Sequence, residues 1–335
     1  MLNTAIIGLG WWGRTLVGSV QGKSEDISFV AGATGRRALA EEFAQEKGFR
    51  LHDDLAAVLA DPEVEAVVLA TPHLDHAHQI VEVAKSGRHV FVEKPFTLDR
   101  ASAEEAVGAA RAADVTLGLG HNRRFHPHME ALKARVAAGE LGTILHCEGT
   151  MTASRGLFMQ ADSWRRDPRQ SPAGGLAGLG IHMVDGMISL FGPLGEVLCQ
   201  SVHRAAPSGD EDTTSILLRF ANGVTGFVSC MTATAPFYRF CVYGSKGIAE
   251  ITTPSLDHFT ITPTPDGLSG HGTPKPVERS HVTRVDTVRL ELEEFARAAK
   301  GRGTFRISPP EMVASASAFE AIARSAADRQ WVRLT

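Results

Sequence analysis

The sequence has few cysteines, little net charge and no long hydrophobic run, and each shortage excludes a class of protein. Its four cysteines are scattered over 335 residues without a Cys-x-x-Cys pair or histidines at zinc-ligand spacing. Neither a disulfide framework nor a metal site is therefore expected. The net charge of −4 provides no basic surface for nucleic acid or an anionic membrane. The longest apolar runs, such as residues 64–70, are far too short to span a bilayer.

The remaining composition is that of an ordinary globular protein. A chain of 335 residues with 43% hydrophobic and 21% charged residues is long enough for two domains, each with its own core. The first residues lack the cationic segment and the small-residue cleavage site of a secretory signal. We therefore expect a cytoplasmic protein whose cysteines are reduced and lie in the core, with no nucleic-acid or membrane partner.

A glycine-rich turn follows the first expected strand. Residues 4–7 are strand-like, and Gly8, Gly10 and Gly13 come next, before helical sequence from Arg14. In this context the first glycine makes a tight turn, the second lets the backbone approach a pyrophosphate, and the third lets helix and strand pack closely. The spacing predicts a dinucleotide-binding turn with the phosphates at a helix N-terminus.

Regular alternation of strands and helices supports this interpretation. Ser102 begins a capping-box spacing, which predicts a helix start. The expected strands include 4–7, 27–33, 66–70, 89–92 and 115–119, and the expected helices include 38–47, 55–60 and 73–86. Six strands with crossover helices predict an α/β, doubly wound parallel sheet as an N-terminal nucleotide-binding domain of residues 1–121.

The stretch Glu93-Lys94-Pro95 directly follows one of these strands. Proline ends the strand because it has no N–H to donate. Ligands of open parallel sheets bind beyond the carboxyl ends of the strands, so Lys94 is expected at the mouth of the site. The alternative is a solvated Glu93–Lys94 pair at a strand end, which contributes little.

After residue 121 the pattern changes to longer alternating segments with hairpin turns. The expected strands are 143–151, 197–204, 213–220, 224–230, 237–243, 248–252, 259–262 and 331–334, and the expected helices include 288–299 and 310–327. Residues 253–276 are rich in Pro, Gly, Thr and Ser and read as a surface excursion. Residues 122–335 are therefore predicted to form an α+β domain with a large, mostly antiparallel open sheet.

These motifs together resemble the Gfo/Idh/MocA family (glucose–fructose oxidoreductase, inositol dehydrogenase, rhizopine catabolism) over essentially the whole chain. The resemblance rests on the glycine turn, Thr71-Pro72, Glu93-Lys94-Pro95 and the later segment 174–182, which appear in this order. Residues 121–125 and Trp164-Arg165 also fit the family's usual form. The resemblance implies a Rossmann domain and a nicotinamide-dependent oxidoreductase acting on sugars, cyclitols or related hydroxy or oxo compounds.

The resemblance also implies two catalytic residues. Lys94 matches the lysine that contacts nicotinamide ribose and substrate, and His182 matches the histidine that moves the proton of the reacting hydroxyl. Histidine titrates near neutrality and suits this proton, while an ammonium group stabilises a developing alkoxide. We expect the two to converge over the carboxyl edge of the first sheet. The alternative for His182 is a structural histidine in a glycine-rich loop.

One position departs from the family. The family commonly has Asp four residues before this histidine, where it binds a substrate hydroxyl, and here that residue is Gly178. The departure predicts a substrate other than a simple inositol-like polyol. Asp185 lies three residues after His182 and is a candidate for orienting its ring, with a capping or solvent-facing role as the preferred alternative.

The resemblance and the position of the motifs suggest a cofactor-binding set: Gly8, Gly10, Trp11, Trp12, Gly13, Thr71, Pro72, His73, His76, Glu93, Lys94, Asn122, Trp164 and Arg165. The second strand ends at Thr34 without a carboxylate, and Arg36 and Arg37 follow. Because arginine pairs well with a 2′-phosphate, NADP is the preferred cofactor, with NAD as the alternative. Arginines near the expected cleft are candidates for clamping a substrate carboxylate: Arg123, Arg124, Arg166 and Arg169.

Two classes of function remain open. The first is an NAD(P)-dependent dehydrogenase or reductase acting on a sugar-like compound, or instead on a cyclic dihydrodiol or an acidic hydroxy compound. The second is a cofactor-binding sensor that has lost turnover. Strands in the second domain carry apolar residues on both faces, so a homo-oligomer, dimer or tetramer, is also expected.

Overall fold

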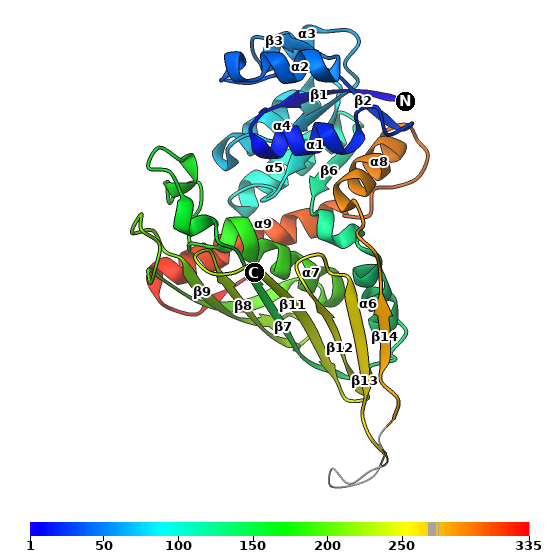
Figure 1. Ribbon diagram of the computed structural model, residues 1–335, viewed down its shortest axis with the longest axis vertical. Helices are drawn as coiled ribbons and strands as arrows, with labels where there is room; N and C mark the ends of the chain where they lie inside the picture. Colours follow the sequence, from blue (N-terminus) through cyan, green and yellow to red (C-terminus); the bar gives the residue numbers. More distant parts are fainter. Residues whose placement is uncertain (267–272, 274, 335) are drawn as a thin grey trace. The chain divides into compact units, whose positions relative to one another are not determined.

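The structure is a computed structural model that describes residues 1–266, 273 and 275–334 (Figure 1). Over these residues the strands form a six-stranded and a nine-stranded sheet. The chain divides into two compact units, one of residues 1–122 and 286–316 and the other of residues 123–285 and 317–335. The division differs from the boundary expected from sequence, because residues 286–316 belong to the first unit and not to the second.

The six-stranded sheet of the first unit is parallel, with the order β3-β2-β1-β4-β5-β6. Its strands are β1 (Leu2–Ile7), β2 (Ile27–Ala33), β3 (Arg50–His52), β4 (Ala66–Leu69), β5 (His89–Glu93) and β6 (Leu117–Gly120). Strand β4 is apolar throughout, and the middle of β5 (residues 90–92) is apolar and buried, as expected for a sheet covered on both faces. The strand order reverses between β1 and β4, which is where doubly wound folds bind their ligands.

Helices connect these strands. They are α1 (Trp11–Val20), α2 (Glu41–Lys47), α3 (Leu55–Ala60), α4 (His76–Lys85) and α5 (Arg100–Ala112). Asp54 caps α3 by accepting a hydrogen bond from the Ala57 N–H at 2.8 Å. The predicted start of α5 at Ser102 is wrong, because the Asp99 carboxylate accepts from the Ser102 N–H and α5 begins at Arg100.

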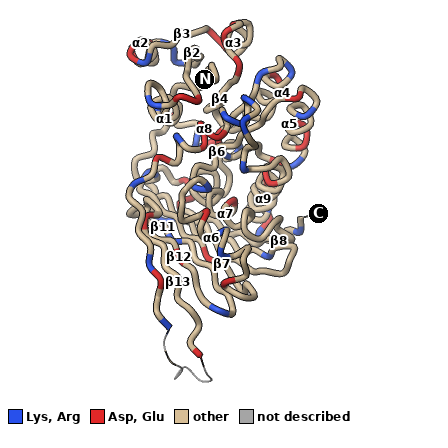
Figure 2. Tube along the Cα trace, turned by 90° about the vertical axis from the view of Figure 1, so that its right-hand side faces the viewer, with Lys and Arg blue, Asp and Glu red and all other residues tan. Residues whose placement is uncertain are grey.

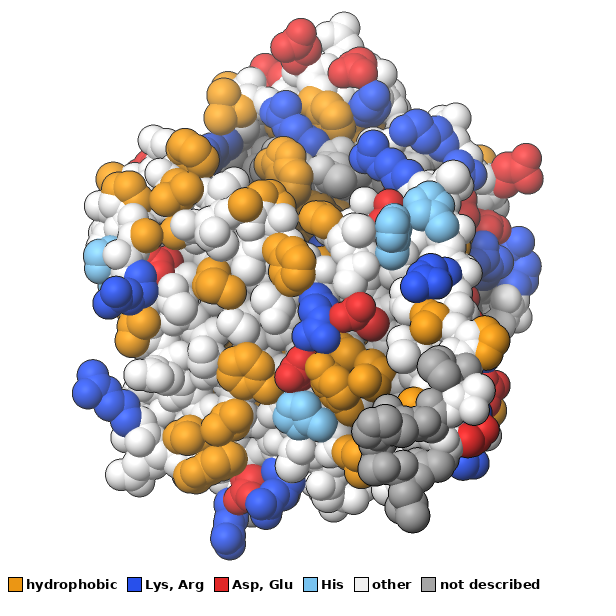
Figure 3. Space-filling model, turned by 60° about the horizontal axis from the view of Figure 1, so that its bottom comes forward, with side chains coloured by type: hydrophobic (Ala, Val, Ile, Leu, Met, Phe, Trp, Pro, Cys, Tyr) orange, Lys and Arg blue, Asp and Glu red, His pale blue; other side chains and the backbone are white. Residues whose placement is uncertain are grey.

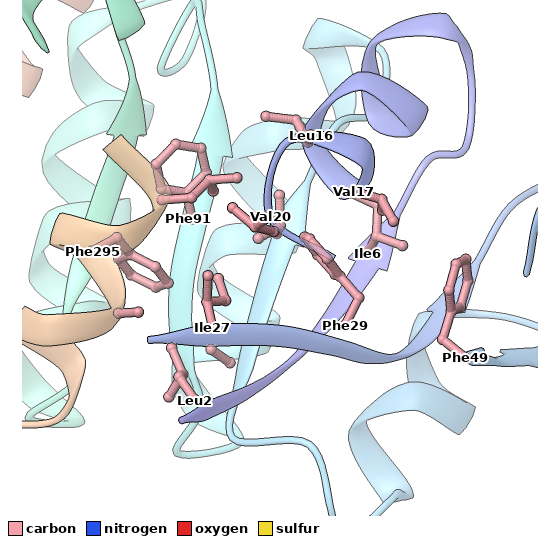
Figure 4. Packing of buried hydrophobic residues seen from close by; sticks show 14 of the residues in the cluster. Leu2, Ile6, Leu16, Val17, Val20, Ile27, Phe29, Phe49, Phe91 and Phe295 are labelled. Atoms are coloured by element: carbon pink, nitrogen blue, oxygen red, sulfur yellow. The ribbon is translucent and has the colours of Figure 1, made fainter. Parts of the chain in front are cut away.

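Helix α8 (Thr287–Ala299) explains why residues 286–316 join the first unit. Its Phe295 is fully buried and meets Phe91 of β5 with ring centroids 5.5 Å apart (Figure 4). Gly118 of β6 makes room for this contact, since a Cβ there would lie 2.7 Å from the Phe91 ring and 2.8 Å from the Phe295 ring. The helix therefore completes the core of the first sheet, although it lies far away in the sequence.

The second unit is built on the nine-stranded sheet, ordered β14-β13-β12-β11-β7-β10-β9-β8-β15. Its strands are β7 (Ile144–Thr152), β8 (Leu194–Val202), β9 (Thr213–Phe220), β10 (Thr225–Met231), β11 (Phe237–Gly244), β12 (Gly247–Thr252), β13 (His258–Pro263), β14 (Glu278–His281) and β15 (Val332–Arg333). All neighbours are antiparallel except β7 and β10, which confirms a mostly antiparallel sheet. Strand β14 was not expected, and residues 267–272 and 274 of the expected surface excursion lie outside the described residues.

Helices α6 (Pro127–Ala137) and α7 (Ile181–Phe191) pack on one face of this sheet (Figure 1). Helix α9 (Pro309–Asp328) belongs to the second unit from Ser317 onward, and its Ser325 hydroxyl accepts from the Cys199 N–H of β8 at 2.9 Å. Basic and acidic residues are interspersed over the whole chain trace (Figure 2). No helix within the described residues has the length and apolar character needed to cross a membrane.

Candidate active site

The glycine turn between β1 and α1 has the geometry that dinucleotide binding needs. Gly8 adopts φ +95°, and a Cβ there would lie 2.4 Å from the Ala70 carbonyl oxygen. A Cβ at Gly13 would lie 1.9 Å from the Gly8 carbonyl oxygen, so only glycine lets α1 pack this closely. A Cβ at Gly10 would meet no atom within 4 Å. The open backbone at Gly10, beside the N-terminus of α1, fits a cofactor pyrophosphate.

Several residues predicted to touch the cofactor hold the adjacent loops together. His76 is fully buried, and its ring nitrogens lie 2.8 Å from the Pro95 carbonyl oxygen and 3.1 Å from the Thr71 carbonyl oxygen. The Thr71 hydroxyl donates to Gln79 at 2.6 Å. His73 is buried beside His76. His76 therefore connects the loop after β4 to the loop after β5, which is a supporting position.

Glu93 and Lys94 lie at the carboxyl end of β5, where the sequence placed them. The Glu93 carboxylate accepts from the Lys94 N–H at 3.2 Å, while the Lys94 side chain keeps part of its surface exposed. Burial raises the pKa of Glu93 to about 7, partly offset by the Lys94 charge and the Trp12 indole. Trp12 of the glycine turn and Glu93 thus lie together, whereas Trp11 is 75% exposed beside Trp12.

Glu93 has a buried acidic neighbour that the sequence analysis missed. Glu291 of α8 is fully buried, and neither of its carboxylate oxygens has a hydrogen-bond partner among the described residues. Burial raises the pKa of Glu291 well above its ordinary range, and the Glu93 charge adds to the effect. Burial thus favours the neutral, protonated form of Glu291. Only the packing of α8 brings these two carboxyl groups together.

The two arginines after β2 differ in their surroundings. Arg37 forms an ion pair with Asp53 at 2.8 Å and donates to the Leu51 carbonyl oxygen at 3.2 Å. Arg36 is exposed, and within the described part of the chain its guanidinium forms no hydrogen bond or ion pair. Thr34 is half-buried at the strand end. Asn122, also predicted to touch cofactor, donates from its amide to the Thr287 hydroxyl of α8 at 2.9 Å.

In the second unit, His182 lies in the first turn of α7. The helix follows a one-turn π-helix, η6 (Leu176–Gly180), where the sequence suggested only a glycine-rich loop. His182 is half-buried. Asp185 of the same helix is buried and receives two hydrogen bonds from the Arg124 guanidinium, at 2.7 and 2.6 Å. The solvent-facing role preferred for Asp185 is therefore wrong, and orientation of His182 by Asp185 stays a prediction.

Gly178 lies below the guanidinium of Arg155. A Cβ at Gly178 would be 2.5 Å from Arg155 Nη2, so an aspartate side chain at this position would occupy the space that Arg155 now fills. Arg155 begins the short helix η4 (Arg155–Phe158), which follows β7. Arg165 lies with its guanidinium 4.2 Å from the Trp164 ring centroid. Burial and the Arg155 charge lower the pKa of Arg165 to about 10.

The arginines that the sequence analysis proposed as carboxylate clamps are engaged elsewhere. Arg124 pairs with Asp185, Arg166 with Asp210 at 2.8 Å, and Arg169 with Asp167 at 2.7 Å. Arg123 lies over the Tyr238 ring at 5.0 Å. No sequence signal connects Arg155 to Gly178, because the two approach each other only in the folded sheet.

Three side chains at one end of the nine-stranded sheet have metal-ligand character. Asp257, His258 and His281 place their ligand atoms within 4.8 Å of one another. His258 and His281 face each other across β13 and β14, and Asp257 accepts from the Thr253 hydroxyl. His281 Nε2 lies 3.9 Å from an Asp257 oxygen. These contacts account for the cluster without an ion.

Comparisons with known proteins agree with this geometry. Residues 2–121 match an oxidoreductase family model with an NAD-binding Rossmann fold, and residues 129–250 match the GFO/IDH/MocA C-terminal domain. Trans-1,2-dihydrobenzene-1,2-diol dehydrogenase of Mus musculus is 30% identical over 241 residues, which are 71% of this chain and 69% of the mouse protein. The scyllo-inositol 2-dehydrogenase (NAD(+)) of Bacillus subtilis is 29% identical over 326 residues, covering 90% and 87% of the two chains.

A solved structure shares the complete fold. Levoglucosan dehydrogenase in complex with NADH and levoglucosan superposes with a TM-score of 0.86 at 22% identity, covering 100% of this chain and 99% of that one. At this identity the likeness shows the fold alone. The sequence matches and the glycine-turn geometry together show that the chain belongs to the GFO/IDH/MocA family of oxidoreductases with an NAD-binding Rossmann fold.

Proposed function

We propose that the protein is a dehydrogenase or reductase that interconverts a hydroxyl and a carbonyl group on a sugar-like or cyclic hydroxy compound. The observation that carries the proposal is Lys94 at the carboxyl end of β5, on the same sheet as the open glycine turn at Gly10. In the second unit, His182 in the first turn of α7 supplies an imidazole, a side chain that can accept and return a proton.

The glycine turn and the N-terminus of α1 would hold the cofactor pyrophosphate, and Lys94 the ribose next to the nicotinamide. A nicotinamide cofactor bound there supplies hydride transfer. Lys94 is assigned to the reacting oxygen, where its ammonium group stabilises developing alkoxide charge. His182 is assigned to the hydroxyl proton, which it accepts during oxidation and returns during reduction.

We further propose that NADP is preferred over NAD, because Arg36 is exposed at the end of β2 and no carboxylate follows that strand directly.

Steady-state kinetics test the two assignments. With the best substrate from a panel of sugars, cyclitols, sugar acids and dihydrodiols, His182→Ala should lower kcat by roughly 10²–10⁴, the range of general acid–base catalysis. Lys94→Ala should cost at least as much, since Lys94 is also assigned to the cofactor ribose. Cofactor binding should survive His182→Ala. Wild-type-like turnover in either variant would remove that residue from the mechanism.

Exposed residues of the same type provide controls. His78 and Lys85 are exposed on α4, so His78→Ala and Lys85→Ala should turn over substrate like the wild type.

A second candidate function is a cofactor-binding sensor without turnover, which the glycine at position 178 favours. This function predicts nicotinamide cofactor binding together with no reaction on any member of the panel.

A further inference from the structure

Two arginines in the second unit have no carboxylate partner among the residues that the structure describes. Arg155 lies over Gly178, and Arg165 lies on the Trp164 ring. Burial alone lowers the pKa of Arg155, and the pKa of Arg165 falls through burial and through the Arg155 charge, with no acidic group contributing to either. Both stay cationic at neutral pH, because a guanidinium is not deprotonated in proteins and the pKa of Arg165, about 10, lies well above 7.

The surroundings of Arg155 and Arg165 differ from those of nearby arginines. Arg124, Arg166 and Arg169 are each paired with an aspartate at 2.8 Å or less. The two guanidinium groups repel each other, and no anion among the described residues offsets this repulsion. Holding them close together therefore costs free energy. Because Arg155 remains exposed while protein packs along its side chain, its guanidinium can reach a dissolved ligand. An anionic ligand would remove the repulsion.

The segments that carry Arg155 and Gly178 are both fixed to one end of the nine-stranded sheet. The Gly156 N–H donates to the Thr232 carbonyl oxygen at 2.6 Å, directly after β10. A Cβ at Gly175 or at Gly180 would lie 3.1 Å from Cys230 Sγ of β10, which shows how closely η6 packs there. The guanidinium is therefore held over Gly178 by the sheet, and His182 follows one helical turn later.

We propose that Arg155 and Arg165 form an anion subsite that binds a carboxylate group of the substrate, over Gly178 and next to His182. The inference rests on the proposed function and narrows its substrate to a hydroxy or oxo acid. A guanidinium recognises a carboxylate through two parallel N–H donors, which also fixes the orientation of the ligand. Glycine at position 178 serves this subsite because any acidic side chain there would pair with Arg155 and compete with the substrate.

Matched pairs of ligands test the subsite by binding, without relying on turnover. Calorimetric titration of the protein saturated with NADP compares each carboxylate with its neutral amide: D-glucuronate, D-galacturonate, L-lactate and mandelate. At least one carboxylate should bind about 10- to 100-fold more tightly than its amide, the range of a charged hydrogen bond. Arg155→Ala and Arg165→Ala should each remove most of this preference.

Substitutions at Gly178 give a second test with a matched control. Gly178→Asp places a carboxylate beside Arg155 and should abolish the preference, whereas Gly178→Asn displaces the guanidinium to the same extent without adding a charge and should keep part of it. The displaced atom is the end of a flexible arginine side chain, so both variants should fold, which circular dichroism checks. Arg169→Ala removes an exposed arginine paired with Asp167 and should leave the preference intact.

The inference is overturned if no carboxylate binds more tightly than its amide, or if the preference survives Arg155→Ala and Arg165→Ala. These outcomes are separate from those of the proposed function. Turnover of neutral sugars with no carboxylate preference refutes the subsite alone. A carboxylate preference that depends on the arginines, in a protein whose turnover is insensitive to His182→Ala, refutes the mechanism alone.

Discussion

Arg36 and Arg37 are adjacent in the sequence but differ in what they contact. Arg37 is paired with Asp53, while Arg36 is exposed at the end of β2. We expect Arg36→Ala to weaken NADP(H) binding by about 10- to 100-fold, because a charged hydrogen bond to the 2′-phosphate is lost. Arg37→Ala should have a smaller effect, and NAD(H) binding should change little in either variant. Fluorescence titration of both cofactors measures this, and tighter binding of NAD(H) by the wild-type protein would contradict the preference.

Glu291 makes a prediction about stability against pH. The pKa of Glu291 is raised above the ordinary value of 4.5, chiefly by burial, and the pKa of Glu93 is raised to about 7. The folded protein then binds more protons than the unfolded chain above pH 4.5, so stability falls as pH rises through 7. Glu291→Gln cannot ionise and should flatten this decline.

Thermal unfolding between pH 5 and 9 measures the effect. Glu105 is an exposed carboxylate on α5, so Glu105→Gln is a control that should keep the wild-type pH profile. If the melting temperature of Glu291→Gln falls with pH as steeply as that of the wild type, the buried carboxyl group is not the cause.

At the scale of elements, α8 stabilises the first unit through a few aromatic contacts. Phe295 is fully buried against Phe91, whereas Leu290 of the same helix is 36% exposed. Phe295→Ala should lower stability by about 3–5 kcal/mol, the usual cost of a large buried truncation. Leu290→Ala should cost much less. Chemical denaturation compares the two variants, and equal losses would show that α8 does not depend on this contact.

At the scale of the whole molecule, the open face of the nine-stranded sheet predicts self-association. Helices pack on one face, where Ile216 and Leu218 are buried, while Leu217 between them is 45% exposed. Leu198 and Phe227 lie opposite Leu217 on the two neighbouring strands. Hydrophobic side chains also gather in several groups on the surface seen in Figure 3. Leu198 and Phe227 are partly exposed, and apolar residues that lie side by side at a surface are typical of an interface.

We therefore expect a homo-oligomer, dimer or tetramer, that Leu217→Arg dissociates. An arginine at position 217, between Leu198 and Phe227, would have to be buried when two copies associate, and burying a charge is unfavourable. Light scattering at micromolar concentration should give a multiple of the chain mass for the wild type and a smaller mass for the variant. Leu39→Arg, at a position 66% exposed in the first unit, should not change the mass. A monomeric wild type would rule out the prediction.

Local patterns in the sequence were sufficient to predict the fold class and the first-unit motifs. Glycine spacing, apolar runs and helix caps act over a few residues, so strand β2 and helix α3 have the bounds expected for them. Alternation predicted the open sheet for the same reason, since side chains on a strand point to opposite faces in turn. Glu93 and Lys94 lie at a strand end because Pro95 ends the strand in the sequence itself.

Contacts between distant segments were decided by the tertiary structure alone. Arg124 and Asp185 are 61 residues apart and meet only because α7 packs beside the start of α6. The same holds for Glu291 beside Glu93, for Phe295 against Phe91, and for Arg155 over Gly178. Periodicity specifies which face of an element is apolar, but not which element covers that face. The partner of each buried charge therefore depends on long-range packing, and so does the chemistry of the candidate site.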